Sequence, residues 1–169
     1  GRAQGFPPLP PSIGRNLQTH SGLFAHLDGL LFTHLHGDHF SRSLMLQALS
    51  ADPPPLVYGP GLQENSVSLR PIYPGLWSFH LGQARLLSLA TVHDGAAFRK
   101  DPHRSFFLRL NGECIFIAGD ALLIPDQARL LRDYYGGPVA AAFINPYQAA
   151  DPESLSFLHV LDPRRIFLY

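Results

Sequence analysis

The sequence predicts a layered α/β (α+β) fold, and three patterns along the chain support this prediction. In the first half, apolar strand-like runs alternate with a helical segment, which is the rhythm of a βαβ unit. In the second half, consecutive β-type runs include a pair joined by Asn111-Gly112, the dipeptide that most strongly favours a two-residue hairpin. Strand and helix patterns then alternate again to the end of the chain. With 169 residues and 46% hydrophobic content, we expect one domain spanning residues 1–169 with a substantial core.

Local signals define the individual elements in order. The proline-rich stretch over residues 7–11 predicts an irregular start before a short helix over residues 12–19. Ser41 and Asp151 are typical capping residues, and they predict helices over residues 41–48 and 152–160. The other expected elements are helices over residues 61–68 and 125–134 and strands over residues 27–33, 56–59, 76–80, 83–92, 103–110, 113–118, 139–144 and 164–169.

Composition excludes some classes of function. Thirteen basic and thirteen acidic residues give a net charge of zero, so no overall charge attracts the chain to nucleic acid or to an anionic membrane. No run of apolar residues approaches the roughly 18 that a membrane span needs. The single cysteine, Cys114, lies inside an apolar run, which predicts a buried structural thiol. A chain with one cysteine has no internal disulfide, and this is compatible with a reducing, cytoplasmic setting.

The most informative motif is Thr-His-Leu-His-Gly-Asp-His, which follows a short apolar run and contributes His34, His36, Asp38 and His39. Imidazole and carboxylate ligands suit zinc, iron or manganese, and no thiolate lies nearby to suggest a structural zinc knuckle. In an extended chain the first three of these side chains share one face, and Gly37 allows a turn that brings His39 round. One short segment can therefore serve two neighbouring ions.

These residues resemble the His-x-His-x-Asp-His signature of the metallo-β-lactamase superfamily. Two further residues stand downstream in the order that such a family requires, because His93 and Asp120 each follow an apolar, strand-like run. The resemblance implies a four-layer αββα sandwich with two divalent metal ions, zinc by default and iron or manganese as alternatives. The ligand set that it implies is His34, His36 and His93 on one ion, Asp38 and His39 on the second, and Asp120 as the bridge.

The family pattern has one more ligand, a histidine after a later strand, whereas this chain ends at Tyr169 without one. The family's opening strands are missing too. We therefore expect a fragment that is incomplete at both termini. The alternative is a naturally degenerate member with a weakened second metal site.

The resemblance implies a metal-dependent hydrolase in which a metal-bound hydroxide attacks a small ester, lactone or phosphodiester. Asp38 is the candidate catalytic residue, because it can also steer the water or carry a proton to the leaving group. The surroundings of His93 and Asp120 are similar to an uncharacterised bacterial branch related to ascorbate-phosphate lactonase. We expect a small-molecule substrate, with no nucleic acid or membrane partner, and the oligomeric state stays open. The alternatives are a tRNase Z-like nuclease, which the histidine motif particularly resembles, and a non-catalytic metal-binding remnant of the fold.

Three further residues are weaker candidates for substrate binding. His103 begins an expected strand beside Arg104, a pair that suits an anionic group, although the pattern favours a surface pair at the edge of a strand. Asn145 and Tyr147 follow the expected strand over residues 139–144, where they line a pocket or form a plain turn.

Overall fold

The structure, a computed structural model, describes residues 10–62 and 70–169. The chain divides into two compact units, Gly1–Val67 and Ser68–Tyr169, and each is described by itself. The helix expected over residues 61–68 lies outside the described residues except for its first two positions, which form a turn.

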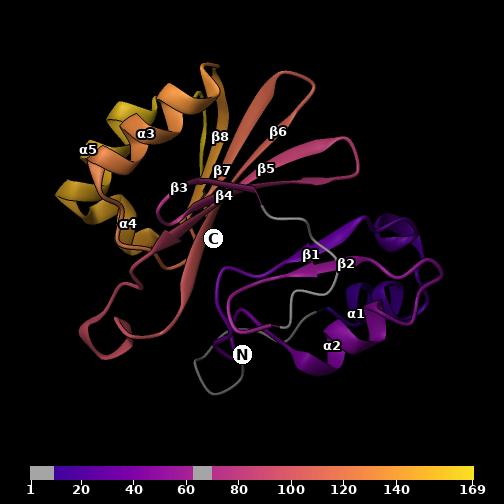
Figure 1. Cartoon of the computed structure of the whole chain (residues 1–169). Coiled ribbons are helices and arrows are strands. Elements are labelled where there is room, and N and C mark those ends of the chain that lie inside the picture. The colour runs from indigo at the N-terminus through magenta and orange to yellow at the C-terminus, as the bar shows by residue number, and fades with distance from the viewer. Residues whose placement is uncertain (1–9, 63–69) are drawn as a thin grey trace. The chain divides into compact units, whose positions relative to one another are not determined.

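The first unit contains a βαβ arrangement of the expected kind (Figure 1). Strands β1 (Gly29–Leu31) and β2 (Leu56–Tyr58) pair in parallel, and α2 (Arg42–Ala48) lies between them in sequence. Parallel strands need such a crossover, because a short turn cannot return the chain to the starting edge. The helix expected to start at Ser41 is confirmed, and the Ser41 side chain caps it by accepting a hydrogen bond from the backbone N–H of Leu44. The remaining elements of this unit are α1 (Pro11–Gln18) and the short η2 (Gly22–Phe24).

The second unit is built on a seven-stranded sheet in which the strands follow one another in sequence order. Pairing is antiparallel from β3 to β7 and parallel from β7 to β9. The expected strands are confirmed with small shifts at their ends, and one strand at the sheet edge was not expected. The strands are β3 (Arg70–Tyr73), which was not expected, β4 (Leu76–Leu81), β5 (Ala84–Thr91), β6 (His103–Leu110), β7 (Glu113–Ile117), β8 (Val139–Ile144) and β9 (Ile166–Leu168).

The Asn111-Gly112 turn sets the register between β6 and β7. Both residues have positive φ, 51° and 82°, as a type I′ turn requires, and Leu110 pairs directly with Glu113. Counting back from this turn, Phe107 pairs with Phe116, and both are buried in the core. The hairpin therefore determines which side chains of these strands enter the core.

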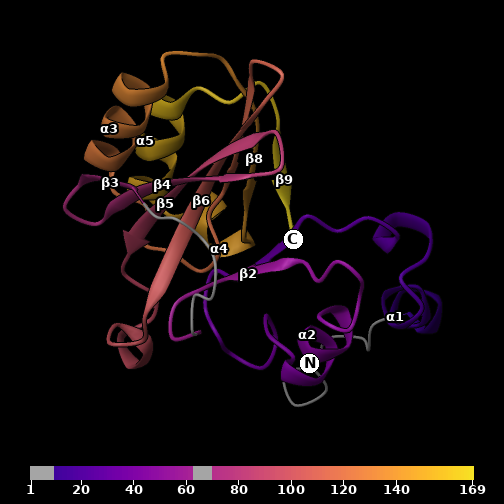
Figure 2. The same cartoon turned by 45° about the vertical axis from the view of Figure 1, so that its right-hand side comes forward.

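Two helices, α3 (Pro125–Tyr135) and α5 (Pro152–Leu161), lie side by side on one face of this sheet (Figures 1 and 2). Their buried residues join those of the strands in one core cluster, which includes Leu131, Phe157 and the buried Cys114. The capping residue expected for α5 is confirmed, since the Asp151 side chain accepts from the Ser154 N–H at 2.8 Å. A further short helix, α4 (Pro146–Ala150), follows β8, and η3 (Ala96–Phe98) follows β5.

The register brings the ends of several strands together at one end of the sheet. Thr91, the last residue of β5, pairs with His103 at the start of β6, while Ile117 at the end of β7 pairs with Phe106 near that same start. Ile117 also pairs with Phe143 near the end of β8. The segments that follow β5, β7 and β8 therefore begin at the same end of the sheet. They carry the polar side chains described next.

Candidate metal centre

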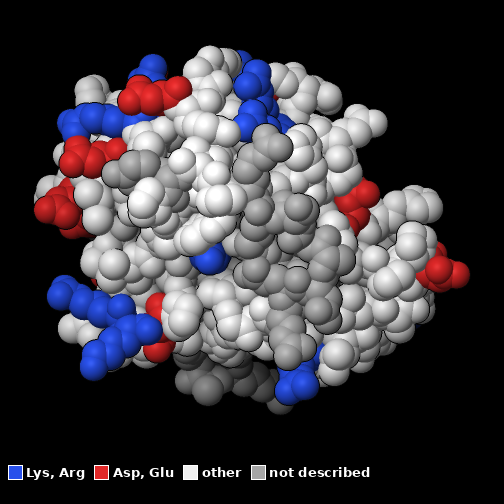
Figure 3. All heavy atoms as spheres, in the orientation of Figure 1, with Lys and Arg blue, Asp and Glu red and all other residues white. Residues whose placement is uncertain are grey.

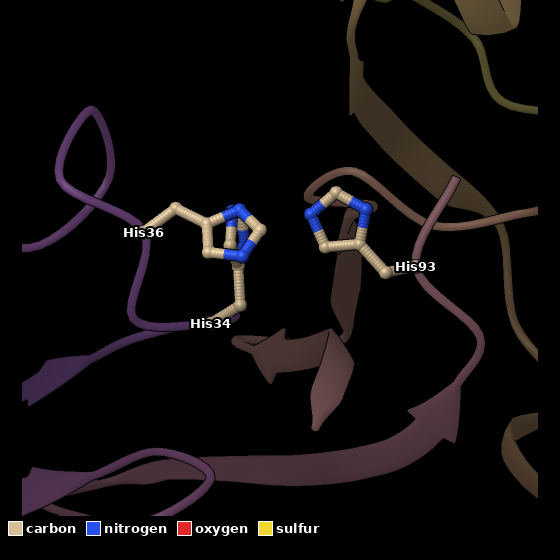
Figure 4. Close-up of side chains that lie close together, drawn as sticks. All are labelled: His34, His36 and His93. Carbon is tan, nitrogen blue, oxygen red and sulfur yellow. The ribbon is translucent and has the colours of Figure 1, made fainter. Parts of the chain in front are cut away.

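The loop after β1 gathers the histidines of the first unit. The ring centroids of His34 and His36 lie 4.7 Å apart, and those of His34 and His39 lie 4.2 Å apart. Figure 4 shows the rings of His34 and His36 close together on this loop, and it draws His93 on the segment that follows β5. His34 is buried, and one nitrogen of its ring lies within 4.8 Å of a ring nitrogen of His36. The motif therefore concentrates imidazole ligands, as expected.

The backbone of this loop differs from the extended chain that we expected. The N–H groups of His39 and Phe40 both donate to the carbonyl oxygen of His36, at 3.0 and 2.8 Å, so residues 37–39 form a turn. The turn brings His39 beside His34, as expected, but Asp38 lies within the turn and not on an extended face. Its Oδ2 lies 3.7 Å from Nε2 of His39.

In the second unit, His93 and Asp120 lie on neighbouring segments. The N–H of Asp94 donates to the Asp120 carbonyl at 2.7 Å, the N–H of Leu122 donates to the Val92 carbonyl at 2.8 Å, and His93 forms an antiparallel bridge with Ala121. These bonds bring Nε2 of His93 to 3.9 Å from Oδ2 of Asp120.

A hydrogen bond determines which nitrogen of His93 carries the proton. Nδ1 lies 2.5 Å from the carbonyl oxygen of Asp94, and a carbonyl only accepts, so Nδ1–H is the donor. In the neutral ring the lone pair then belongs to Nε2, the nitrogen nearer the Asp120 carboxylate. A metal-binding histidine is commonly oriented in this way, with one nitrogen donating to a backbone carbonyl and the other directed at the ion.

His103 belongs to the same buried region. Its ring centroid lies 5.4 Å from that of His93, and its Nδ1 lies 2.6 Å from Oγ1 of Thr91. Oγ1 of Thr91 is 3.4 Å from Oγ of Ser105, which in turn donates to the Ala118 carbonyl at 2.7 Å. His103 is thus a buried neighbour of His93. The substrate contact expected of it stays a prediction.

Asn145 and Gln148 donate hydrogen bonds to Asp120 and to its two neighbours in the chain. Nδ2 of the buried Asn145 donates to Oδ1 of Asp120 at 3.1 Å. Nε2 of Gln148 donates to the carbonyls of Gly119 and Ala121, at 3.0 and 2.7 Å. Sequence reasoning missed Gln148, although the spacing Asn-x-x-Gln is typical of a capping box, which these two residues form at the start of α4.

Two tyrosines at this end of the sheet, Tyr147 and Tyr169, differ in exposure and contacts. Tyr147, on the same helix as Gln148, is 79% exposed, and its expected substrate contact stays a prediction. Tyr169 follows β9. Burial raises the pKa of its phenol and the Asp120 carboxylate raises it further, while a bond from the backbone of Gly119 lowers it. Tyr169 was expected only as the end of a strand, yet its hydroxyl lies near the Asp120 segment.

The donor chemistry fits a divalent metal. The first unit supplies three imidazoles and one carboxylate from one loop, and the second supplies an imidazole with a defined lone pair 3.9 Å from a carboxylate. Neutral nitrogen and anionic oxygen ligands suit zinc, iron and manganese, and they do not distinguish among these metals.

Comparisons with known proteins give one kind of match. No family profile matches the chain, and no curated protein sequence matches it. Among solved structures, the chain is similar to CmlA, a diiron β-hydroxylase from Streptomyces venezuelae, with a TM-score of 0.62 and 16% identity over 83% of this chain and 35% of that one. It is also similar to human tRNase Z, short form, with a TM-score of 0.52 and 14% identity over 83% of this chain and 71% of that one. A metallo-β-lactamase from Erythrobacter litoralis matches at a TM-score of 0.39 and 12% identity, over 58% of this chain and 43% of that one.

These likenesses define the fold. CmlA and tRNase Z are members of the metallo-β-lactamase fold, and the chain has this fold, as the histidine motif predicts. The chain spans about a third of the CmlA structure, 35% of its length. Among the helices of the described residues, none has the length and apolarity to cross a bilayer.

Proposed function

We propose that this chain is part of a metal-dependent hydrolase with two divalent ions, whose ligands are the histidine motif and the His93–Asp120 pair. The observation that carries the proposal is the orientation of His93. Its Nδ1 donates to a backbone carbonyl, so its lone pair is on Nε2, 3.9 Å from a carboxylate oxygen. This arrangement suits an imidazole and a carboxylate that bind a metal ion.

The assignment of ligands follows the resemblance of the motif. His34, His36 and His93 would hold one ion, Asp38 and His39 the second, and Asp120 would bridge the two ions. The carboxylates offset part of the positive charge of the ions, which otherwise repel each other at the separation of about 3.5 to 4 Å that is common in two-metal sites. Zinc is the first candidate, and the similarity to a structure described as a diiron enzyme supports iron as the main alternative.

Two divalent ions would supply Lewis acidity, which polarises the substrate and makes water nucleophilic near neutral pH. The chain's own residues then have three tasks. The Asp94 carbonyl keeps the proton of His93 on Nδ1, so that Nε2 stays a ligand. Asp120 is fixed through its side chain by Asn145. Asp38, on its turn, would take a proton from the attacking water and carry it to the leaving group.

The proposed substrate is a small ester, lactone or phosphodiester. A net charge of zero supports a small molecule over a large polyanion. On the face that Figure 3 shows, acidic and basic side chains of the described residues lie scattered in small groups, and the basic ones form no broad patch there. A small-molecule partner and a cytoplasmic location remain predictions of the sequence.

The test is whether turnover requires bound metal and whether it is lost when one proposed metal ligand is substituted. The chain is stripped with a chelator and reloaded separately with zinc, iron or manganese. It is then assayed with a generic phosphodiester, an aryl ester and a lactone. We expect hydrolysis only after reloading, and its loss in His36→Ala but not in His80→Ala, which removes an exposed histidine of β4. Turnover that survives both the chelator and His36→Ala would contradict the proposal.

A nuclease is the second candidate, and the similarity to human tRNase Z over 83% of the chain favours it. The distinguishing measurement is RNA cleavage and binding across salt concentrations. Steeply salt-dependent binding to RNA with cleavage would favour the nuclease, because released counterions dominate such binding. Stoichiometric metal without turnover on any substrate would instead favour the non-catalytic remnant.

A further inference from the structure

Gln148 is a buried glutamine whose side chain makes three hydrogen bonds. Its Oε1 accepts from the backbone N–H of Asn145 at 2.9 Å, which completes the capping box of α4. Its Nε2 uses both hydrogens, one on the carbonyl of Gly119 and one on the carbonyl of Ala121. The cap requires only the oxygen. The two bonds from the nitrogen are therefore additional, and they reach the residues immediately before and after Asp120.

Asn145 reaches the same residue by a different route. Its Oδ1 caps α4 by accepting from the N–H of Gln148 at 2.9 Å. Its Nδ2 donates to Oδ1 of Asp120, on the side of the carboxylate opposite to Oδ2, which lies near His93. The amide thus fixes the rotation of the carboxylate and leaves Oδ2 directed toward the imidazole.

The backbone around Asp120 needs such support. Gly119 has a φ of +62°, the left-handed region, so the chain turns sharply at the end of β7. On one side of the turned segment, the bond from Asp94 N–H and the bridge at Ala121 tie it to the His93 segment. On the other side, Gln148 holds the two flanking carbonyls. Asp120 is therefore fixed from both sides.

We propose that Gln148 and Asn145 are positioning residues for Asp120: together they set the backbone and the carboxylate rotation that metal binding requires. The proposal rests on the proposed function for what Asp120 does, but the hydrogen bonds that carry it are independent of any ion. A capping box that only began a five-residue helix would place no donors on both neighbours of one aspartate.

The test uses two variants that remove contacts to the Asp120 segment and keep a capping oxygen at position 145. Asn145→Ser retains a capping oxygen but has no amide to reach the carboxylate. Gln148→Met keeps a similar volume and removes the bonds to both carbonyls, together with the bond that Oε1 accepts from the Asn145 N–H, while the Asn145 side chain still caps α4 through Oδ1. The matched controls are Asp151→Ser, which exchanges one capping residue for another on α5, and Leu158→Ala, which destabilises the core of the same unit.

Two readouts separate positioning from general stability. The first is the affinity for Zn²⁺ and the electronic spectrum of the Co²⁺-loaded chain, which reports ligand geometry. We expect both variants to lose about 10- to 100-fold in affinity, the usual effect of residues that orient a ligand, and to change the spectrum. Leu158→Ala is measured at a temperature or denaturant concentration at which it is as stable as the two variants. It should keep both the Zn²⁺ affinity and the Co²⁺ spectrum of the unmodified chain.

The second readout is hydrogen exchange in the metal-free chain, at the backbone N–H groups of Asp94 and Leu122. We expect Gln148→Met to lower protection at these amides by a larger factor than at the amides of β6, whereas Leu158→Ala lowers both alike. Unchanged protection at Asp94 and Leu122 would overturn the proposal, as would wild-type metal affinity and spectrum in both variants. If the unmodified chain bound no metal, the proposed function would fail, and hydrogen exchange alone would decide the role of Gln148.

Discussion

Nε2 of His93 lies 3.9 Å from Oδ2 of Asp120, although the two residues are separated by a complete hairpin of the sheet. Antiparallel bonding between the segments that follow β5 and β7 creates this proximity, and the Nδ1 bond to the Asp94 carbonyl orients the ring. The backbone of one unit thus holds an imidazole and a carboxylate close together.

The carboxylate of Asp120 is therefore expected to matter for its charge and not for its shape. Asp120→Asn keeps an oxygen that accepts from Asn145, so the fold should be retained. Substitution of a residue that only orients a metal ligand typically lowers metal affinity about 10- to 100-fold, and Asp120→Asn should lower it by more than this. Equilibrium dialysis with zinc measures this. Asp126→Asn, an exposed position on α3, is the control and should bind like the unmodified chain.

Asp38 tests the proton-transfer step. Asp38→Asn retains an oxygen that can still bind metal but cannot accept a proton, so we expect kcat to fall by about 10²- to 10⁴-fold with a smaller change in KM. The metal content must be measured on the same sample. A variant with both ions and undiminished turnover would remove this role from Asp38.

Tyr135 makes stability depend on pH at the alkaline end. Burial raises the pKa of its phenol from 10.0 to about 12, with Arg85 and Arg109 opposing and Cys114 and Tyr134 adding to the shift. A folded-state pKa above the unfolded value means that the native state keeps its proton longer. The stabilisation is therefore complete below pH 10 and is lost as pH rises from 10 toward 12, by roughly 3 kcal/mol.

Urea denaturation of the unmodified chain and of Tyr135→Phe, between pH 8 and 12, measures this contribution. Cys114 and Tyr169, whose pKa values are also raised, contribute slopes of the same sign in both proteins, so only the difference between the two curves is informative. We expect Tyr135→Phe to lose less stability above pH 10. Parallel curves would show that Tyr135 does not titrate as described.

The β6–β7 turn should be sensitive to its glycine. Gly112 has a φ of +82°, and a Cβ at this position meets no atom within 4 Å. The cost of Gly112→Ala is therefore a backbone cost, of about 1–2 kcal/mol. Thermal or urea unfolding measures it, with Gly137→Ala as a control where no positive φ is required. Equal stability of the two variants would argue against a type I′ turn.

Local patterns predicted most of the elements because their signals lie within a few residues. The Asn-Gly turn, the caps at Ser41 and Asp151 and the apolar runs of the sheet are of this kind. Strand β3 was missed because it is a short edge strand that contains a proline. Helix α4 was missed because five residues after Asn145 also fit a plain turn.

The candidate site was predictable in its residue types but not in its supporting contacts. The histidine motif is contiguous in sequence, so His34, His36 and His39 were found together. The position of Asp38 was not predicted correctly. The hydrogen bond from the His39 N–H to the His36 carbonyl makes a turn where an extended chain was expected. Gln148 was missed because its partners lie 27 and 29 residues away, and only the folded sheet brings them near.

The central proposal, that His36 and His93 bind the same metal ion, is tested by counting ions in a double-mutant cycle. Elemental analysis is carried out on the unmodified chain, on His36→Ala, on His93→Ala and on the double variant. If both histidines hold the same ion, the unmodified chain contains two ions, each single variant loses the same one, and the double variant loses no more than either single variant. Losses that add in the double variant would mean that the two histidines bind different ions, and a chain without metal would contradict the proposed function.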